Sequence, residues 1–159
     1  MVARLARIDE VDAVVDLYEA VAAEGRWIAA EAPVDRPSRV ERFTRSIERD
    51  DATMFVAEGD GRLVGSLGIE VRPYGVADLG MMVAADRRGQ GVGSALLQAA
   101  IEWARAAGAH KVVLECWPHN EAAIALYKKF GFEEEGLLRG QYRRRNGELW
   151  DAVVMGLLL

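Results

Sequence analysis

The stretch Val83–Leu97, VAADRRGQGVGSALL, decides the fold of this chain. A β-like run over residues 77–83 leads into it, and an amphipathic helical pattern leaves it. Between the two, glycines at 89, 91 and 93 remove three side chains where a helix begins, so that backbone N–H groups come within reach of a ligand. Because a helix N-terminus carries unpaired N–H donors and the positive end of the helix dipole, the loop predicts an anion site, above all for phosphate or pyrophosphate.

Two common phosphate-binding patterns do not fit this loop. A Walker A motif requires Gly-Lys-Ser/Thr, whereas Gly93 is followed by Ser94 and Ala95. A dinucleotide fingerprint that begins at Gly89 would need glycine at position 94, which is Ser. What remains is Arg88-x-x-Gly91-x-Gly93 directly after a strand, with Arg87 and Arg88 adding positive charge.

This signature resembles the acetyl-CoA loop of the GNAT-type N-acetyltransferases. The later pattern Asn120-x-x-Ala123-x-x-Leu126-Tyr127-x-x-x-Gly131-Phe132 is similar to the segment that follows the loop in that family. The two patterns stand in the family's order and spacing over about 83–132, and the flanking elements agree across nearly the whole chain. The tail, 144–155, loosely resembles branches that act on amino acids and small amines. For the loop alone, a glycine-rich turn without a ligand is the alternative.

Composition bounds the class of protein. The 159 residues predict one domain, 1–159, with a sizeable core. A net charge of -5 argues against nucleic acid as the main partner and is compatible with a cationic or amine substrate. One cysteine, Cys116, excludes an intrachain disulfide, and His110 and His119 lack metal-ligand spacing, so no metal is expected. The chain has neither a long apolar run nor a signal-peptide pattern, which predicts a cytoplasmic protein without membrane contact.

Hydrophobic periodicity predicts the order of elements. Strands are expected at 2–8, 53–58, 62–70, 76–83, 111–117, 132–143 and 148–158. Helices are expected from an Asp9 N-cap to Gly25, from a Ser38-x-x-Glu41 capping box, from the glycine loop to Gly108, and from Asn120 to Gly131. The inward face of the helix after the glycine loop is predicted to hold Leu96, Leu97, Ala100, Trp103, Ala104 and Ala107.

The connections predict the fold class. Tight turns at 59–61 and 73–75 make the strands before the loop antiparallel, and Asn146-Gly147 predicts a C-terminal hairpin. The strand–loop–helix–strand unit at 76–117 requires a parallel crossover. We therefore expect an α+β, three-layer α/β/α fold with a mixed, mostly antiparallel sheet of about six to seven strands. By resemblance, this is the acyl-CoA N-acyltransferase fold.

The resemblance implies roles for individual residues. Backbone groups of Met82 and Val83 would hold the pantetheine arm, and Asn120 would hydrogen-bond the pantetheine or the phosphate end. Tyr127 would lie near the thioester sulfur and protonate the leaving thiolate; a free tyrosine, with a pKa of roughly 10, carries the required proton. Core packing is the alternative for Tyr127. The pyrophosphate would be held by the amides of Arg88, Gly89, Gln90, Gly91, Val92, Gly93 and Ser94.

The base is expected among three carboxylates. Glu115 is the first choice, because it stands near a strand end and twelve residues before Tyr127, an arrangement also found in the branch that acetylates a ribosomal protein's N-terminal alanine. Glu70 and Asp78 are the reserves. Cys116 is expected to be a buried strand residue rather than a nucleophile.

Three further expectations concern the surroundings of the site. Glu24, Arg26 and Trp27 either contact the acceptor or pack locally. The run Arg143-Arg144-Arg145 is expected to be solvated surface. The two histidines are expected to face solvent.

The sequence thus predicts an N-acetyltransferase that moves the acetyl group of acetyl-CoA directly to a primary amine of a small molecule. A strand amide near Met82 or Val83 would stabilise the oxyanion. The alternatives are a protein N-terminal acetyltransferase, transfer of a longer acyl chain, and an acyl-CoA-binding regulatory module without turnover. The resemblance allows a homodimer, and the sequence gives no interface.

Overall fold

The structure is a computed structural model that describes residues 1–159. Its elements are, in chain order, β1 (Ala3–Leu5), α1 (Val11–Ala23), α2 (Arg36–Glu48), β2 (Ala52–Gly59), β3 (Arg62–Arg72), β4 (Val76–Val83), α3 (Val92–Ala106), β5 (Lys111–Cys116), α4 (Glu121–Lys129), β6 (Glu133–Arg143) and β7 (Leu149–Leu158). The seven strands form one mixed sheet in the order β1-β2-β3-β4-β5-β7-β6. The predicted fold class is confirmed.

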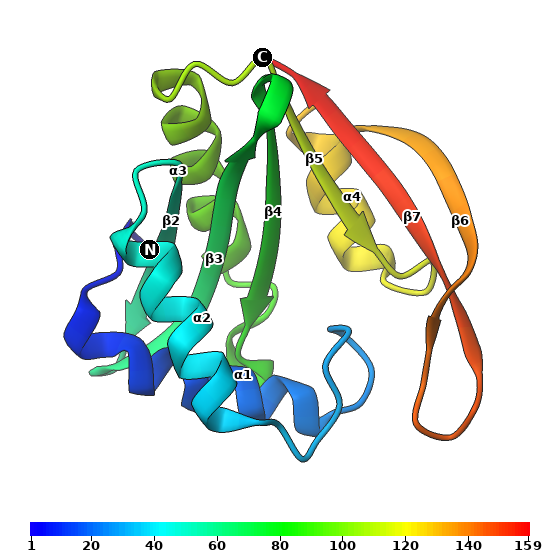
Figure 1. The fold of residues 1–159 in the computed structure, drawn as a ribbon, viewed down its shortest axis with the longest axis horizontal. Coiled ribbons are helices and arrows are strands. Elements are labelled where there is room, and N and C mark those ends of the chain that lie inside the picture. The colour runs from blue at the N-terminus through cyan, green and yellow to red at the C-terminus, as the bar shows by residue number, and fades with distance from the viewer.

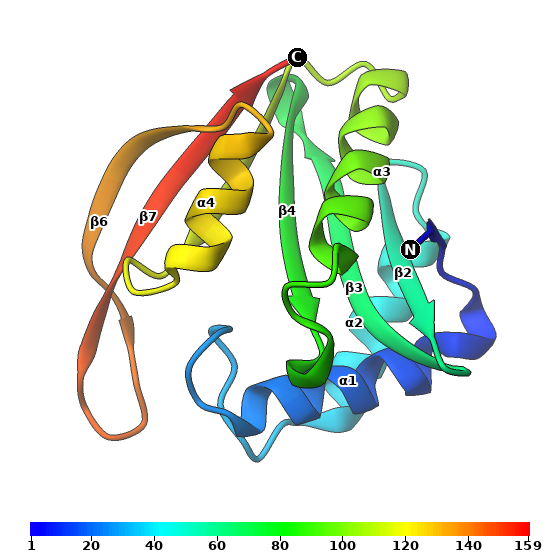
Figure 2. The same cartoon turned by 180° about the vertical axis from the view of Figure 1, so that it is seen from behind.

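Helices cover both faces of the sheet. α2 lies in front of it in Figure 1, and the reverse view in Figure 2 shows α3 and α4 on the opposite face. The sole parallel pair is β4 with β5, which α3 connects, as the crossover argument predicted. A core of fully buried aliphatic side chains joins the layers, including Leu67 of β3, Leu96 and Leu97 of α3, Leu114 of β5 and Met155 of β7.

The β2–β3 hairpin follows its sequence signal. Asp60 and Gly61 both have positive φ, 51° and 73°, which is the geometry of the two-residue turn that matches strand twist. The predicted strand at 76–83 is β4 without change. The first strand is shorter than expected and ends at Leu5.

Helix starts were predicted less well. Asp35, not Ser38, caps α2: its side chain accepts a hydrogen bond from the Ser38 N–H at 3.2 Å, and Pro37 occupies the first turn. Asp9 lies in a short 3₁₀ turn, and the N-cap of α1 is Glu10. In α3, Ala107 is exposed beyond the helix end, and Ile101 takes a buried place instead. The two helix starts are therefore displaced by one to three residues from the predicted positions.

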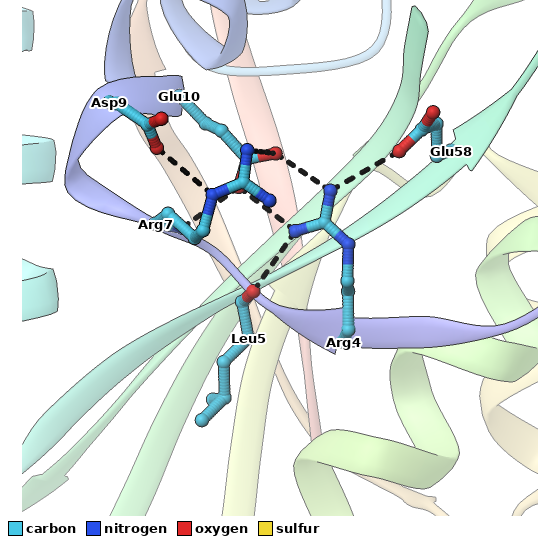
Figure 3. A network of polar contacts seen from close by, with 6 residues as sticks. All are labelled: Arg4, Leu5, Arg7, Asp9, Glu10 and Glu58. Atoms are coloured by element: carbon cyan, nitrogen blue, oxygen red, sulfur yellow. Dashed lines mark hydrogen bonds and ion pairs between the residues drawn. The ribbon is translucent and has the colours of Figure 1, made fainter. Parts of the chain in front are cut away.

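Glu10 joins the first strand to the first helix (Figure 3). Its carboxylate accepts hydrogen bonds from both terminal nitrogens of Arg4, at 2.9 and 2.7 Å, and from the Arg7 backbone N–H at 2.9 Å. The Arg4 guanidinium holds the pKa of Glu10 at about 2, below its usual range. This carboxylate is therefore ionised at any pH where the protein is expected to work, and it fixes β1 against the chain entering α1.

Candidate active site

The sheet splits between β4 and β5. The two strands pair only from Val76–Asp78 to Lys111–Val113 and diverge beyond that point (Figure 1). The Gly75 carbonyl accepts from the His110 N–H at 2.9 Å, on the β5 side, and the Ala84 N–H donates to Val64, on the β3 side. Since backbone direction alternates along a strand, the odd-numbered residues of β4 turn their peptide groups toward β5.

Three residues of β4 therefore lie beside the split with backbone groups turned toward it: Leu79, Met81 and Val83. Met82 has the opposite orientation and stands across from Ser66 in the β3–β4 ladder. The Val83 carbonyl accepts a hydrogen bond from Arg88 Nε at 3.1 Å. An extended ligand that adds to this edge would meet Met81 and Val83.

The two faces of the sheet carry different chemistry. A Cβ built on Gly65 would lie 2.6 Å from Val92 of α3, so the odd-numbered residues of β3 face that helix. The even-numbered residues of β3 face the α1–α2 side. Asp78 of β4 shares that face, because it pairs with Glu70. Glu115 is on the same side, because Asp78 pairs with Val113, two residues before it.

A cleft of about 510 Å³ is lined from both faces. Met81, Cys116 and Tyr127 come from the α3–α4 side, and Asp78 and Glu115 come from the α1–α2 side. The cleft therefore passes through the split between β4 and β5. Its other walls include the loop residues Trp27, Ile28, Ala29 and Ala30, the α2 residues Arg39, Arg42 and Phe43, and Ser66, Gly68, Glu70, Arg72, Gly80, Trp117, Asn120 and Tyr142.

The glycine loop has the predicted backbone. Gly89 and Gly91 have φ of 74° and 83°, and Gly91 is the N-cap of α3. A Cβ at either position would meet no atom within 4 Å, so the space beside the loop is open. Gly93 differs: its Cβ would lie 3.0 Å from Leu126 of α4, so this glycine allows α3 and α4 to approach. The loop thus combines left-handed turns, an open flank and a 15-residue helix behind it.

The loop arginines are already paired. Arg88 donates two hydrogen bonds to the Glu24 carboxylate, at 2.8 and 2.7 Å, and Arg87 forms an ion pair with Asp60. The extra charge that the sequence suggested is therefore neutralised, and the predicted anion site would rest on backbone amides. Glu24 also accepts from Trp27 Nε1 at 2.8 Å, so it links this loop to a wall of the cleft rather than lining the cleft itself.

Tyr127 lies at the cleft on α4 and is 5% exposed. Burial raises its pKa, so the hydroxyl keeps its proton through the neutral range. Cys116 lines the same cleft, and burial raises the pKa of its thiol to about 11, which disfavours the thiolate that a nucleophile requires. Asn120 caps α4, its Oδ1 accepting from the Ala123 N–H at 3.2 Å.

The three candidate carboxylates differ in their partners. Glu70 lies 3.3 Å from Arg49 and 3.7 Å from Arg72, and Asp78 lies 2.8 Å from Arg72. Glu115 accepts a hydrogen bond from the Tyr142 hydroxyl at 2.5 Å. Burial raises the pKa of Asp78 despite its arginine, with the charges of Glu115 and Glu70 adding to the effect. Burial and the bond to Glu115 raise the pKa of Tyr142 to about 12.

Two arginines of α2 add positive charge to the α1–α2 side of the cleft. Arg39 and Arg42 line the cleft, and neither has a carboxylate within ion-pair distance. The Arg39 guanidinium stacks on Tyr18, 4.4 Å from its ring centroid. An unpaired guanidinium facing a cleft favours a ligand carboxylate or phosphate.

Arg144 overturns the expectation of a solvated arginine run. It is 4% exposed, and its guanidinium lies 4.2 Å from the Trp150 ring and 5.4 Å from the Trp117 ring. Arg143 and Arg145 are exposed, as expected. His119 is exposed too, yet its Nε2 lies 3.0 Å from the Arg26 carbonyl oxygen. No group of side chains in the chain has the arrangement of a metal site.

The comparisons with known proteins agree with this geometry. The model of the "Acetyltransferase (GNAT) family" matches residues 14–132. This chain belongs to the GNAT acetyltransferase family. Membership makes it an acetyl-CoA-dependent N-acetyltransferase, with acetyl-CoA as cosubstrate, as the resemblance implied. None of the helices in the chain combines the length and the apolar composition of a membrane-spanning segment.

Several relatives are named for small amino-acid substrates. The chain is 39% identical over 130 residues to the L-amino acid N-acetyltransferase AaaT of Escherichia coli, covering 77% of this chain and 78% of that protein. It is 30% identical over 162 residues to the L-methionine sulfoximine/L-methionine sulfone acetyltransferase of Pseudomonas aeruginosa, covering 98% and 93%. The crystal structure of the ribosomal-protein-alanine N-acetyltransferase of Brucella melitensis matches with a TM-score of 0.89 at 29% identity, covering all of both chains.

Sequence reasoning missed four groups around the cleft: Arg39, Arg42, Tyr142 and Arg144. The predicted two-residue turn at Asn146-Gly147 would have paired Tyr142 with Asp151. The structure pairs Tyr142 with Trp150, because the Arg144 N–H donates to the Glu148 carbonyl and the loop holds three residues. No local pattern distinguishes Arg144 from the arginines beside it. The unpaired state of Arg39 and Arg42 depends on where every acidic side chain lies.

Proposed function

We propose that the protein acetylates the amino group of a small α-amino acid or close analogue, by direct transfer from acetyl-CoA. The observation that carries this proposal is the cleft through the sheet, which has Tyr127 on one side and a carboxylate cluster with free arginines on the other. The open glycine loop lies at the start of α3, on the same face of the sheet as Tyr127. The names of the relatives support an amino-acid acceptor. The names also favour a small acceptor over a protein N-terminus.

The proposed grip on acetyl-CoA uses backbone groups. Amides from residue 88 to residue 94 bind the pyrophosphate at the start of α3. The pantetheine adds to the free edge of β4, where alternation favours Met81 and Val83 over the predicted Met82 as the backbone partners. Asn120 retains a side-chain NH₂ for the pantetheine while its oxygen caps α4. A peptide N–H at this edge stabilises the oxyanion of the tetrahedral intermediate.

The acceptor lies on the opposite face. Arg39 and Arg42 attract its carboxylate, and the carboxylates of Asp78 and Glu115 attract its ammonium. We assign proton removal first to Asp78, because burial raises its pKa toward the range of an effective base. Glu115, the first choice from sequence, is held by Tyr142 and orients the ammonium. Its carboxylate is the competing base.

The chemical step then needs no covalent enzyme intermediate. The free amine attacks the thioester carbonyl, the C–S bond breaks, and Tyr127 gives its proton to the leaving thiolate. The proton taken from the amine leaves through the carboxylate cluster. A neutral Cys116 beside the path is consistent with direct transfer.

The test is thiol release from acetyl-CoA with a panel of acceptors. The panel pairs each L-amino acid with the amine that lacks its carboxylate, and adds a peptide with N-terminal alanine. We expect turnover with amino acids and at least a tenfold loss of kcat/KM when the carboxylate is removed. Absence of turnover with every amine, despite acetyl-CoA binding, would contradict the proposal and favour a binding module. Preference for the peptide would contradict the small acceptor.

A further inference from the structure

One segment closes the acceptor side of the cleft. The strap, residues 24–33, follows α1 and contributes Trp27, Ile28, Ala29 and Ala30 to the cleft wall. In Figure 1 it rises from the end of α1 toward the lower part of the β6–β7 hairpin. It belongs to the β1–β4 half of the molecule, while the hairpin belongs to the other side of the split.

Two arginines of the hairpin hold the strap across the split. Arg144 donates from Nη1 to the Ala29 carbonyl at 2.9 Å, and its Nε lies 3.7 Å from Glu31. Arg145 donates its backbone N–H to Glu31 at 2.9 Å and its Nη2 to the Pro33 carbonyl at 2.9 Å. Arg145 also donates to the Ala32 carbonyl.

The two arginines have different environments. Arg144 is buried, its guanidinium lies beside the rings of Trp150 and Trp117, and Trp117 is itself a wall of the cleft. Arg145 is exposed. A buried cation with fixed donors gives the contact its geometry, because its guanidinium cannot turn to water without leaving two indole rings. We call the contacts of Arg144 and Arg145 with Ala29, Glu31, Ala32 and Pro33 the clasp. Arg144 is the residue that fixes its geometry.

The other end of the strap is tied to the glycine loop. Glu24 accepts two hydrogen bonds from Arg88, and His119 of the β5–α4 loop lies 3.0 Å from the Arg26 carbonyl oxygen. The strap thus spans from the predicted pyrophosphate site, over the cleft, to the C-terminal hairpin. β4 and β5 pair over only three residues each. Beyond that ladder, where the strands diverge, the strap therefore fixes the distance between the β1–β4 half of the sheet and the β5–β7 half.

We propose that Arg144 is a positioning residue: by clasping the strap to the β6–β7 hairpin it sets the width and shape of the amine pocket. Arg144 is not among the residues that line the cleft, so it acts on the pocket through the strap. This inference rests on the proposed function for its kinetic consequence, but the clasp itself does not depend on turnover.

The experiment compares three variants of the full chain. Arg144→Met keeps an apolar side chain against the two indoles and removes every side-chain donor. Arg144→Lys retains the charge and one donor direction. Arg143→Met is the control, because Arg143 is the exposed neighbour of Arg144. Each variant is measured for KM of the amine, KM of acetyl-CoA, kcat, and hydrogen exchange of the amides of the strap.

We expect Arg144→Met to raise the amine KM by at least tenfold, with the acetyl-CoA KM within twofold of the parent. Strap amides should exchange faster, while those of β2 and β3 keep their protection. Arg144→Lys should recover part of both effects, and Arg143→Met should have neither. Unchanged strap exchange, or equal losses for both substrates, would overturn the clasp as a positioning device.

The outcomes separate this inference from the proposed function. If the parent chain acetylates no amine, the proposed function fails, and exchange in the absence of substrate still decides the clasp. If the parent is active and Arg144→Met loosens the strap without moving the amine KM, the clasp is structural only and the inference is wrong.

Discussion

The glycine loop and the acceptor cleft are built in opposite ways. The loop is one contiguous stretch, and its conformation follows from glycines with positive φ at the start of a helix. The acceptor side combines β3, β4, β5, β6, α2 and the strap, brought together only by the fold. A site for a cosubstrate that is the same in every reaction can be formed by the backbone of one contiguous segment. A site that selects among amines is made from side chains far apart in sequence.

Tyr127→Phe should give the largest effect on turnover, because we place the Tyr127 hydroxyl between the acetyl-CoA site and the acceptor cleft. Loss of the proton donor should lower kcat by at least tenfold, and up to about 100-fold, with acetyl-CoA affinity unchanged. Steady-state kinetics and calorimetry measure the two quantities separately. Turnover at the parent rate would remove the hydroxyl from the chemistry and leave core packing as the role of this ring.

Asp78→Asn and Glu115→Gln decide which carboxylate of the acceptor cleft is the base. A base acts when ionised, and the raised pKa of Asp78 makes the parent lose activity as pH falls through that pKa. Asp78→Asn should lower kcat/KM by about tenfold to 100-fold, most at low pH, where few amine molecules are already deprotonated. Glu115→Gln should lower it less and evenly. The reverse pattern in the pH–rate profiles would transfer the base role to Glu115.

Gly91→Val tests the loop alone. A branched side chain at φ 83° costs about 1–3 kcal/mol of backbone strain, so the amides should lose their alignment and acetyl-CoA affinity should fall about tenfold. Gly147→Val is the matched control: its φ is 90° and its added Cβ also meets nothing within 4 Å, but it lies in the hairpin turn. Equal loss of affinity in both variants, measured by calorimetry, would mean that strain rather than the loop is responsible.

Glu10→Gln should spare both regions, because the network in Figure 3 contributes no residue to the cleft. The pKa of Glu10 is lowered to about 2, so its stabilising effect is present above the usual carboxyl pKa and is lost as pH falls from about 4.5 to 2. The variant should be less stable by about 1–2 kcal/mol at neutral pH and less sensitive to acid, by denaturant titration. A changed kcat would show that the scaffold and the site are coupled.

The contrast between the regions also explains what the sequence could predict. The crossover at 76–117, the hairpin turns and the helix that begins at the glycine loop depend on residues close together in the chain, and they were predicted. The Ser38 capping box was wrong by one turn, because the Asp35 side chain accepts from the Ser38 N–H and the helix begins at Arg36. Arg144 was misread because its indole partners and the Ala29 carbonyl are supplied by other segments.

The most direct test of the account is a backbone amide NMR titration of the protein with coenzyme A. We predict saturable shifts that are largest for Gly89, Gly91, Gly93 and Ser94, with smaller shifts at Met81 and Val83 and little change along α2. Absence of saturable shifts, or shifts that leave residues 88–94 unaffected, would contradict the claim that the backbone of this loop binds the cosubstrate.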